Sequence, residues 1–234
     1  MIKVTVWNEY FHEREHDAIR KIYPDGIHGC IADFLRKDAD MEVRCATLDM
    51  PECGLTEEVL NNSDVLIWWG HAKHNDVPDE IAERVKKYVL NGMGFIGLHS
   101  AHFSKPLKLL LGTTMSLKWR YGDSERLICT MPSHPIAEGV PETIILPEEE
   151  MYGEYFDIPK PDDVVFTGWF SSGNVFRSGC TFTRGCGKIF YFQPGHEEYP
   201  IYYDGNIQKI ITNAVRFVKP VNRRTEDYEP VHCM

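Results

Sequence analysis

The chain has 234 residues, of which 43% are hydrophobic and 26% are charged, so it can bury a substantial hydrophobic core. Its 25 basic and 35 acidic residues give a net charge of −10, and no Lys/Arg run exceeds the pair Arg223 and Arg224, which argues against a nucleic-acid partner. The apolar stretches are only strand-length and the first ten residues lack the pattern of an export signal, so we expect a cytoplasmic protein with no membrane partner.

The seven cysteines are an odd number and include no C-x-x-C pair. In a reducing compartment such cysteines are expected to be reduced, buried side chains. The sequence therefore predicts neither a disulfide framework nor a thiolate zinc site.

The first half of the chain alternates apolar strands with amphipathic helices. Strands are predicted over residues 2–7, 41–47, 65–69 and 94–98, and helices over 25–37 and 78–90. Continuous apolar strands between helices are typical of a parallel sheet covered on both faces. In such sheets ligands bind beyond the carboxyl ends of the strands.

The second half is expected to be more antiparallel. Strands are predicted over 119–131, 143–146, 164–169 and 175–192, separated by short turns, with a hairpin connection at 184–187 and an amphipathic helix over 207–218. Residues 219–234 are polar and are predicted to form a surface tail. Because the sequence contains no repeat or clear linker, we predict one domain over 1–218.

Histidines follow several predicted strands. His71 and His74 follow 65–69, His99 and His102 follow 94–98, and His196 follows the last strand. His196 is followed by Glu197 and Glu198, an arrangement that suits either an acid/base histidine oriented by a carboxylate or a metal ligand. For His71 and His74, a solvated loop position is an equal alternative.

Other polar and aromatic residues adjoin the same strand ends. Glu9 closes the first strand, and His28 lies in the first turn of a helix, whose N-terminus favours a neutral imidazole, although packing beneath the sheet is an equal alternative. Nearby aromatic residues, among them Trp69 and Tyr152, suit a sugar or another flat hydroxylated ligand, although most are expected in the core. The acidic stretch comprises Glu148, Glu149, Glu150 and Glu154, of which at least two are predicted to be solvated.

Five segments in this order resemble the ThuA-like (trehalose-utilisation) family: VTVWNEYFHE (4–13), IYPDGIHG (22–29), IWWGHAKH (67–74), GLHSAH (97–102) and FQPGHEEYP (192–200). The resemblance covers about residues 2–218. It implies the class I glutamine amidotransferase-like architecture, which is an α/β, flavodoxin-like, doubly wound fold. That fold has a mostly parallel sheet with helices on both faces, and here an antiparallel extension.

The chain departs from true amidotransferases at the nucleophile. Those enzymes place a cysteine at a G-x-C-x-G turn between a strand and a helix, followed later by a histidine and a glutamate in an H-P-E segment. Here the turn holds His99, while His196 and Glu198 keep the H-x-E spacing. A histidine cannot form the thioester that glutamine hydrolysis requires, and Ser100 is expected to point away from the apex of the turn.

Without a nucleophile, we predict a sugar-modifying isomerase, lyase or hydrolase that acts on a carbohydrate or keto-sugar. The predicted catalytic residues are His99, His196 and Glu198, and the predicted substrate-binding residues are Glu9, His28, His71, Trp69 and Tyr152. His99, His196 and His28 are the candidate ligands for a divalent metal, for which Zn²⁺ is the best match.

The expected partners are a small carbohydrate and, as the resemblance implies, an oxidoreductase that acts on the same sugar. We also expect a homo-oligomer and find no indication of a nucleotide cofactor. The alternative is a non-catalytic sugar-binding or scaffolding protein on a degenerate amidotransferase fold.

Overall fold

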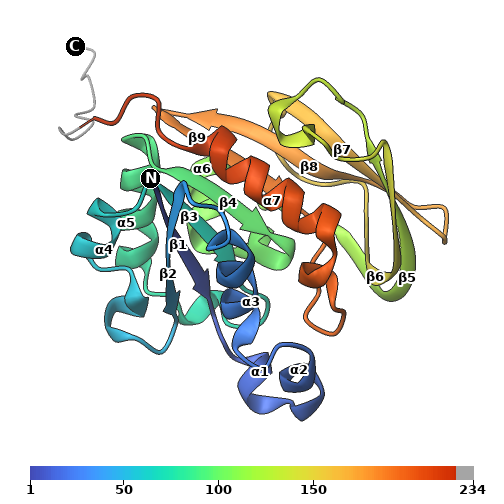
Figure 1. Cartoon of the computed structure of the whole chain (residues 1–234), viewed down its shortest axis with the longest axis horizontal. Helices are drawn as coiled ribbons and strands as arrows, with labels where there is room; N and C mark the ends of the chain where they lie inside the picture. The colour runs from blue at the N-terminus through green and yellow to red at the C-terminus, as the bar shows by residue number, and fades with distance from the viewer. Residues whose placement is uncertain (225–234) are drawn as a thin grey trace.

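The computed structural model describes residues 1–224, which contain one nine-stranded mixed sheet in the order β2-β1-β3-β4-β9-β8-β7-β5-β6 (Figure 1). The end of the predicted tail, residues 225–234, lies outside the described residues. Before that point, the Arg223 guanidinium donates hydrogen bonds to the carbonyl groups of Leu60 and Ser63.

Five strands form the parallel half of the sheet. They are β2 (Met41–Thr47), β1 (Ile2–Asn8), β3 (Val65–Trp69), β4 (Gly94–Leu98) and β9 (Gly187–Phe192), and all four pairings among them are parallel. The side chains of β1, β3, β4 and β9 are almost entirely buried, as expected for strands covered on both faces, whereas the edge strand β2 is only partly buried.

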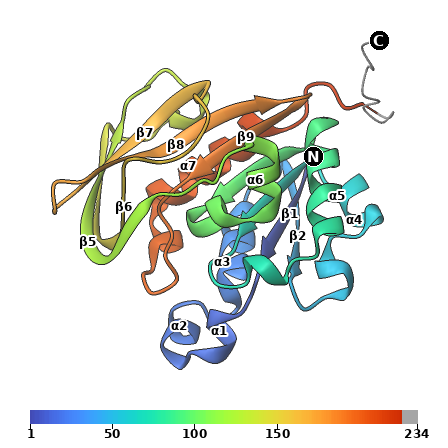
Figure 2. The same cartoon turned by 180° about the vertical axis from the view of Figure 1, so that it is seen from behind.

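Helices cover both faces of this half (Figures 1 and 2). On one face, α3 (Gly26–Leu35) and α7 (Gly205–Val218) pack with strand residues such as Val6. On the other, α5 (Asp79–Leu90) and α6 (Lys105–Leu111) pack with residues such as Trp7. Because successive strand side chains point to opposite faces, Val6 and Trp7 belong to different cores. The short helices are α1 (His12–Glu15), α2 (Asp17–Ile22), α4 (Glu57–Asn61), η1 (Pro51–Gly54), η2 (His74–Asp76), η3 (His99–Phe103), η4 (Pro135–Ala137) and η5 (Ile201–Tyr203).

The other four strands form the antiparallel half. They are β8 (Val175–Arg184), β7 (Asp163–Phe170), β5 (Lys118–Cys129) and β6 (Thr143–Gly153). All four pairings that join them to one another and to β9 are antiparallel. The expectation of a mostly parallel sheet is therefore wrong, because the long, closely connected strands after residue 117 contribute as many pairings as the parallel half.

Four parallel strands end at one edge of the sheet in register. Asn8 pairs with Trp69, Trp69 with Leu98, and Leu98 with Phe192. The segments that follow β1, β3, β4 and β9 therefore emerge side by side. We call this the carboxyl edge of the sheet.

The remaining sequence-based expectations concern cysteines and membrane association. The six cysteines among residues 1–224 are all free, as expected. No helix within these residues has the length and hydropathy needed to cross a membrane.

Candidate functional site

Three histidines and one glutamate converge at the carboxyl edge. His71 follows β3, His99 follows β4, His196 follows β9, and Glu150 comes from β6. One side-chain N or O atom of each lies within 4.8 Å of those of the other three. The imidazole centroids are 5.2 to 5.6 Å apart. We call these four residues the histidine centre.

The ring of His99 is held in one orientation. His99 has a φ angle of 51° at the turn between β4 and η3, and its backbone carbonyl accepts a hydrogen bond from the Tyr191 hydroxyl at 2.9 Å. Its Nδ1 lies 3.0 Å from the backbone carbonyl oxygen of Gln193, which can only accept, so Nδ1 carries a proton. The other ring nitrogen, Nε2, then points at Glu150.

The contact between His99 and Glu150 requires a shared proton or a cation. The His99 Nε2 and the Glu150 Oε2 are 3.2 Å apart and both buried. In a neutral imidazole protonated at Nδ1, Nε2 is an acceptor, as are the carboxylate oxygens. Two facing acceptors need a proton between them, either on Nε2 or on the carboxyl group, or a cation that binds both. Burial alone would raise the pKa of Glu150, but the hydrogen bond and charge of His99 outweigh burial and lower that pKa.

His71 is oriented by two carboxylates. Its Nδ1 lies 2.8 Å from both carboxylate oxygens of Glu197, which leaves Nε2 for the histidine centre. Glu9, which is buried, accepts hydrogen bonds at 2.8 to 2.9 Å from the backbone amides of His71, Ala72 and Lys73. Burial would lower the pKa of His71, but the hydrogen bond and charge of Glu197 raise it overall.

His196 is placed by a third carboxylate. Glu149 on β6, fully buried, accepts hydrogen bonds from the backbone amides of Gly195 at 2.8 Å and His196 at 3.2 Å. The His196 Nδ1 accepts a hydrogen bond from the backbone amide of Glu198 at 3.2 Å, and its buried Nε2 has no partner. Burial, followed by the charge of His99, lowers the pKa of His196 to about 4, so its imidazole is neutral near pH 7.

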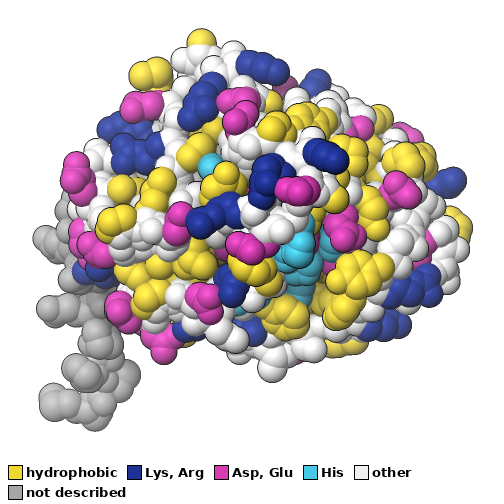
Figure 3. Space-filling model, turned by 90° about the horizontal axis from the view of Figure 1, so that it is seen from below, with side chains coloured by type: hydrophobic (Ala, Val, Ile, Leu, Met, Phe, Trp, Pro, Cys, Tyr) yellow, Lys and Arg dark blue, Asp and Glu magenta, His cyan; other side chains and the backbone are white. Residues whose placement is uncertain are grey.

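A cleft of about 620 Å³ opens beside the histidine centre. Figure 3 shows histidine side chains gathered in a hollow of this face, with hydrophobic, acidic and basic side chains around it. The lining residues are His12, His16, Ala18, Ile19, Ile22, His71, Ala72, Tyr121, His196, Glu197 and Glu198. His12, from α1, lies 3.6 Å from both Glu9 and Glu197 and forms a second potential ligand group with His71 and Glu197.

Two residues predicted to bind substrate instead support the histidines. The Trp69 indole is buried and donates a hydrogen bond to the carbonyl of Gly195 at 3.0 Å. Tyr152, also buried, stacks on His99 with centroids 5.1 Å apart, and its hydroxyl is 2.7 Å from the Ser100 hydroxyl. Ser100 is thus buried, and the tyrosine hydroxyl that it contacts also lies 3.4 Å from the His99 Nε2.

The structure does not bring His28 to the histidine centre. Its Nδ1 lies 3.1 Å from the Asn8 amide nitrogen, and it belongs to neither group of potential metal ligands within residues 1–224. The pKa of His28 is lowered, as expected, but burial is the main cause. Glu198 is exposed and contacts His196 through its backbone, while the neighbouring Glu197 makes the carboxylate contacts.

Sequence reasoning did not assign Glu150 or His12 to the site, and it interpreted the acidic stretch as a loop, whereas Glu148, Glu149 and Glu150 lie in β6. Glu148 is exposed and Glu154 pairs with Arg177, but Glu149 and Glu150 are buried in β6. One signal was available. Side chains two residues apart in a strand share a face, which places Glu150 beside Tyr152, an aromatic residue already assigned to the site.

The fold and the site together define an α/β protein whose polar centre lies beyond the carboxyl ends of parallel strands. Residues 3–218 match the family model described as trehalose utilisation, ThuA, and the chain belongs to this family. Membership suggests a role in sugar metabolism. Among curated proteins, none matches this chain.

Solved structures share the fold at low sequence identity. A ThuA-like protein from Parabacteroides merdae is 14% identical with a TM-score of 0.65, covering 95% of this chain and 92% of that one. A Salmonella typhimurium protein described as cytoplasmic is 16% identical with a TM-score of 0.63, covering 94% and 100%. A β-galactosidase from Bacillus circulans is 14% identical with a TM-score of 0.59, covering 94% of this chain but 32% of that chain.

Proposed function

We propose that this protein is an enzyme that modifies a small carbohydrate or keto-sugar with the help of a divalent cation. His71, His99, His196 and Glu150 would hold the cation. Three imidazoles and one carboxylate are a donor set that suits Zn²⁺, and the chain belongs to the trehalose-utilisation family.

The observation that carries the proposal is the 3.2 Å approach of the His99 Nε2 to the Glu150 carboxylate. A cation between them would satisfy both acceptors. The buried, unpartnered Nε2 of His196 gives independent support, because a buried nitrogen without a partner is costly unless something binds it.

The surrounding residues suit proton transfer near such a cation. When bound, a divalent cation polarises a sugar carbonyl and makes the neighbouring C–H more acidic. His12 faces the cleft, its Nδ1 has no hydrogen-bond partner, and burial lowers its pKa, so it is neutral near pH 7. We assign to His12 the role of accepting a proton from the substrate, while Glu197 keeps the His71 proton on Nδ1.

Zinc titration by calorimetry of Glu150→Gln tests the proposal without an activity assay. Glu148→Gln is the matched control, because Glu148 lies in the same strand but is exposed. We expect Glu150→Gln to weaken zinc binding at least about 100-fold and Glu148→Gln to bind like the wild type. Equal affinities in the two variants would refute the proposed ligand set.

A second candidate function is acid–base chemistry without a metal. The observation in its favour is the hydrogen bond from the Glu198 amide to the His196 Nδ1, which places the proton of the neutral ring on Nε2. Cation binding at Nε2 would move this proton to Nδ1 and break that hydrogen bond. Wild-type protein that does not bind zinc, cobalt or manganese would favour this candidate.

Several expectations about the whole protein stay predictions. These are the partner oxidoreductase, the homo-oligomer, the single domain over 1–218 and the cytoplasmic location. We also propose that the parallel half, in the order β2-β1-β3-β4-β9, is a flavodoxin-like unit to which the antiparallel half is joined.

A further inference from the structure

Two exposed aromatic residues extend from the histidine centre along β5. The Tyr121 ring lines the cleft, with its centroid 5.7 Å from that of His196. Trp119 lies next to it, with centroids 5.4 Å apart. Trp119 and Tyr121 are 53% and 57% exposed, although most large aromatic side chains of this chain are buried. We call this pair the aromatic ledge.

The irregular pairing of β5 places the ledge at the cleft. β5 pairs regularly with β6 up to Arg120, then the register shifts between Arg120 and Asp123, and Gly122 has a φ angle of 67°. Such a bulge re-aims the side chains beside it. Tyr121 is therefore directed over the cleft instead of continuing the regular face of the strand.

The charges around the cleft disfavour an anionic ligand. Glu197 and Glu198 line it, and Glu150 lies in the adjoining histidine centre. Among residues 1–224, those that line the cleft include no Lys or Arg. Four basic residues directly adjoin lining residues in the sequence, namely Arg20, Lys21, Lys73 and Arg120. Three of them are paired with aspartates: Arg20 with Asp17 at 2.7 Å, Lys73 with Asp76 at 3.5 Å and Arg120 with Asp123 at 2.8 Å. A phosphorylated or acidic sugar would meet the carboxylates of the lining, and no Lys or Arg among the lining residues would compensate its charge.

We propose that the aromatic ledge binds the second ring of a neutral disaccharide or glycoside whose reacting ring lies over the histidine centre. Exposed aromatic faces contact the apolar face of a sugar ring, while the acidic groups of the cleft accept hydrogen bonds from its hydroxyls. A cleft of about 620 Å³ has room for more than one ring. This inference rests on the proposed function, because it places the substrate at the same centre.

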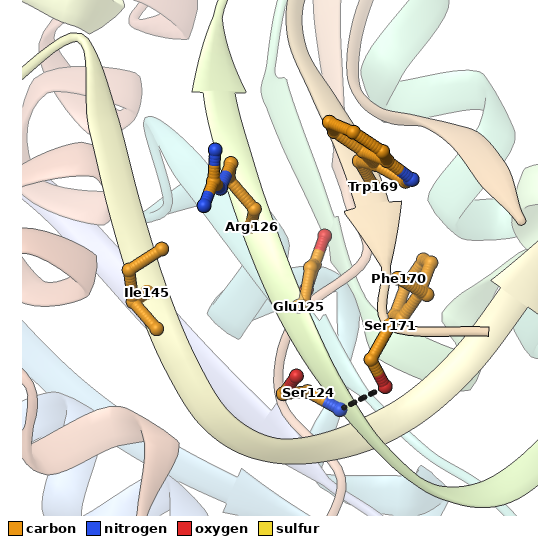
Figure 4. A pocket seen from close by; sticks show the side chains of 7 residues that line it. All are labelled: Ser124, Glu125, Arg126, Ile145, Trp169, Phe170 and Ser171. Atoms are coloured by element: carbon orange, nitrogen blue, oxygen red, sulfur yellow. Dashed lines mark hydrogen bonds between the residues drawn. The ribbon is translucent and has the colours of Figure 1, made fainter. Parts of the chain in front are cut away.

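A comparable tryptophan elsewhere on the sheet provides a control. Trp169 on β7 is 51% exposed and lines a separate, shallow pocket of about 290 Å³ with Arg126 and Ile145 (Figure 4). The Arg126 guanidinium lies 5.8 Å from the centre of the Trp169 ring. Trp169 matches Trp119 in type and exposure but does not line the cleft of the histidine centre.

The test is calorimetric titration of zinc-loaded protein with four neutral disaccharides (trehalose, maltose, sucrose and lactose), with glucose, and with glucose 6-phosphate. We expect at least one disaccharide to bind more tightly than glucose. Trp119→Ala should then weaken the binding of that disaccharide about tenfold or more and leave glucose within about twofold. Trp119→Phe should retain most of the affinity, and Trp169→Ala should bind like the wild type.

Several results would contradict the proposal that the aromatic ledge binds a second sugar ring. These are no binding of any of the four disaccharides, tighter binding of glucose 6-phosphate, equal losses in Trp119→Ala and Trp169→Ala, or a wild-type dimer that Trp119→Ala dissociates in sedimentation velocity. Zinc content is measured on the same samples. If the sugar titrations contradict the ledge but the wild type binds one zinc ion per chain, the proposed function still stands. If the wild type binds no zinc, that result refutes the proposed function separately.

Discussion

At the scale of single residues, two buried carboxylates position the histidine centre without entering it. Glu9 binds the amides of the loop that carries His71, and Glu149 binds the amides of Gly195 and His196. Both side chains are buried, and burial raises the pKa of each. Their role is thus to fix backbone segments, and the positions of the imidazoles follow from it.

Removal of Glu9 should therefore weaken cation binding indirectly. Glu9→Ala loses the acceptor for three backbone amides, so the His71 loop is expected to become less ordered. We expect zinc affinity, measured by competition with a chelating dye, to fall about 10- to 100-fold. The exposed Glu15 provides the control variant Glu15→Ala. Unchanged zinc affinity in Glu9→Ala would show that the loop keeps its place without this carboxylate.

A second residue-scale prediction concerns Glu125, whose carboxyl accepts a hydrogen bond from the Ser178 hydroxyl at 3.0 Å. Burial raises the pKa of Glu125 to about 8. The folded chain therefore keeps a proton that the unfolded chain loses near pH 4.5, and stability falls as pH rises between these values. At about 1.4 kcal/mol per pKa unit, the free energy of unfolding should fall from pH 5 to pH 8 by on the order of 3 kcal/mol more in wild type than in Glu125→Gln.

Urea unfolding at both pH values checks this difference. The charge of Glu125 also raises the pKa of Glu149, so Glu125→Gln removes this coupling as well, and both effects contribute to the difference. The pH dependence due to groups that do not contact Glu125 is shared by both proteins and cancels in the comparison. The exposed Glu142 provides the control variant Glu142→Gln, which should keep the wild-type profile. A Glu125→Gln profile parallel to that of the wild type would mean that Glu125 is already ionised in the folded chain.

The sequence indicated His99 and His196 because each directly follows a buried apolar strand, which fixes where the side chain can lie. It did not distinguish Glu197 from Glu198, because the direction of a side chain in a turn depends on the local backbone. His12 was also not predicted, because it lies in a four-residue helix that is too short to give a periodic apolar pattern. Sequence reasoning therefore placed the site at the carboxyl edge of the sheet but did not identify all the side chains that contact one another there.

At the scale of elements, the turn after β9 shows how tightly the site is built. Gly195 has a φ angle of 140°, and a Cβ atom added there would collide with the Tyr202 side chain. Its carbonyl accepts a hydrogen bond from the Trp69 indole, and its amide donates one to the Glu149 carboxylate. Only glycine satisfies the backbone angle and the close approach together.

We expect Gly195→Ala to lower the free energy of unfolding by roughly 1–3 kcal/mol, because of backbone strain and crowding. It should also weaken zinc binding by displacing His196. Gly112→Ala is the matched control, because Gly112 has a φ angle of 70° at the end of α6 but no atom within 4 Å of an added Cβ. Urea unfolding and zinc titration of both variants check the prediction, and equal effects of the two substitutions on zinc affinity would contradict it.

β6 shows why Glu150 was not predicted as a residue of the site. The apolar pattern predicts a strand only over 143–146, followed by an acidic loop, but the strand continues to Gly153. Its pairing with β5 extends the strand through Glu149 and Glu150. Pairing with a partner distant in sequence overrides local composition here, since strand formation depends on the neighbours in the sheet.

At the scale of the whole molecule, the site joins the two halves of the sheet. β6 is the last strand of the sheet, yet Glu149 binds the amides that follow β9, although β8, β7 and β5 lie between the two strands in the sheet. Figure 1 shows β5 and β6 bending toward the carboxyl edge of the parallel strands. Three residues of the histidine centre thus follow parallel strands, and Glu150 comes from the antiparallel half.

Cation binding should therefore stabilise both halves as one unit. A cation that binds only the folded chain adds about 2.7 kcal/mol to the free energy of unfolding at a concentration 100 times its Kd. We expect zinc to shift the urea unfolding of the wild type as a single transition and to leave Glu150→Gln unshifted. Separate transitions, with only one shifted by zinc, would show that the site does not couple the halves.

The central claim is that His71, His99, His196 and Glu150 bind one divalent cation together. Anomalous diffraction at the zinc absorption edge, from crystals of wild-type protein equilibrated with zinc, tests it most directly. We predict one strong anomalous peak per chain, within coordination distance of all three imidazoles and the Glu150 carboxylate. A peak bound only by His12, His71 and Glu197, or no peak at the carboxyl edge, would contradict the claim.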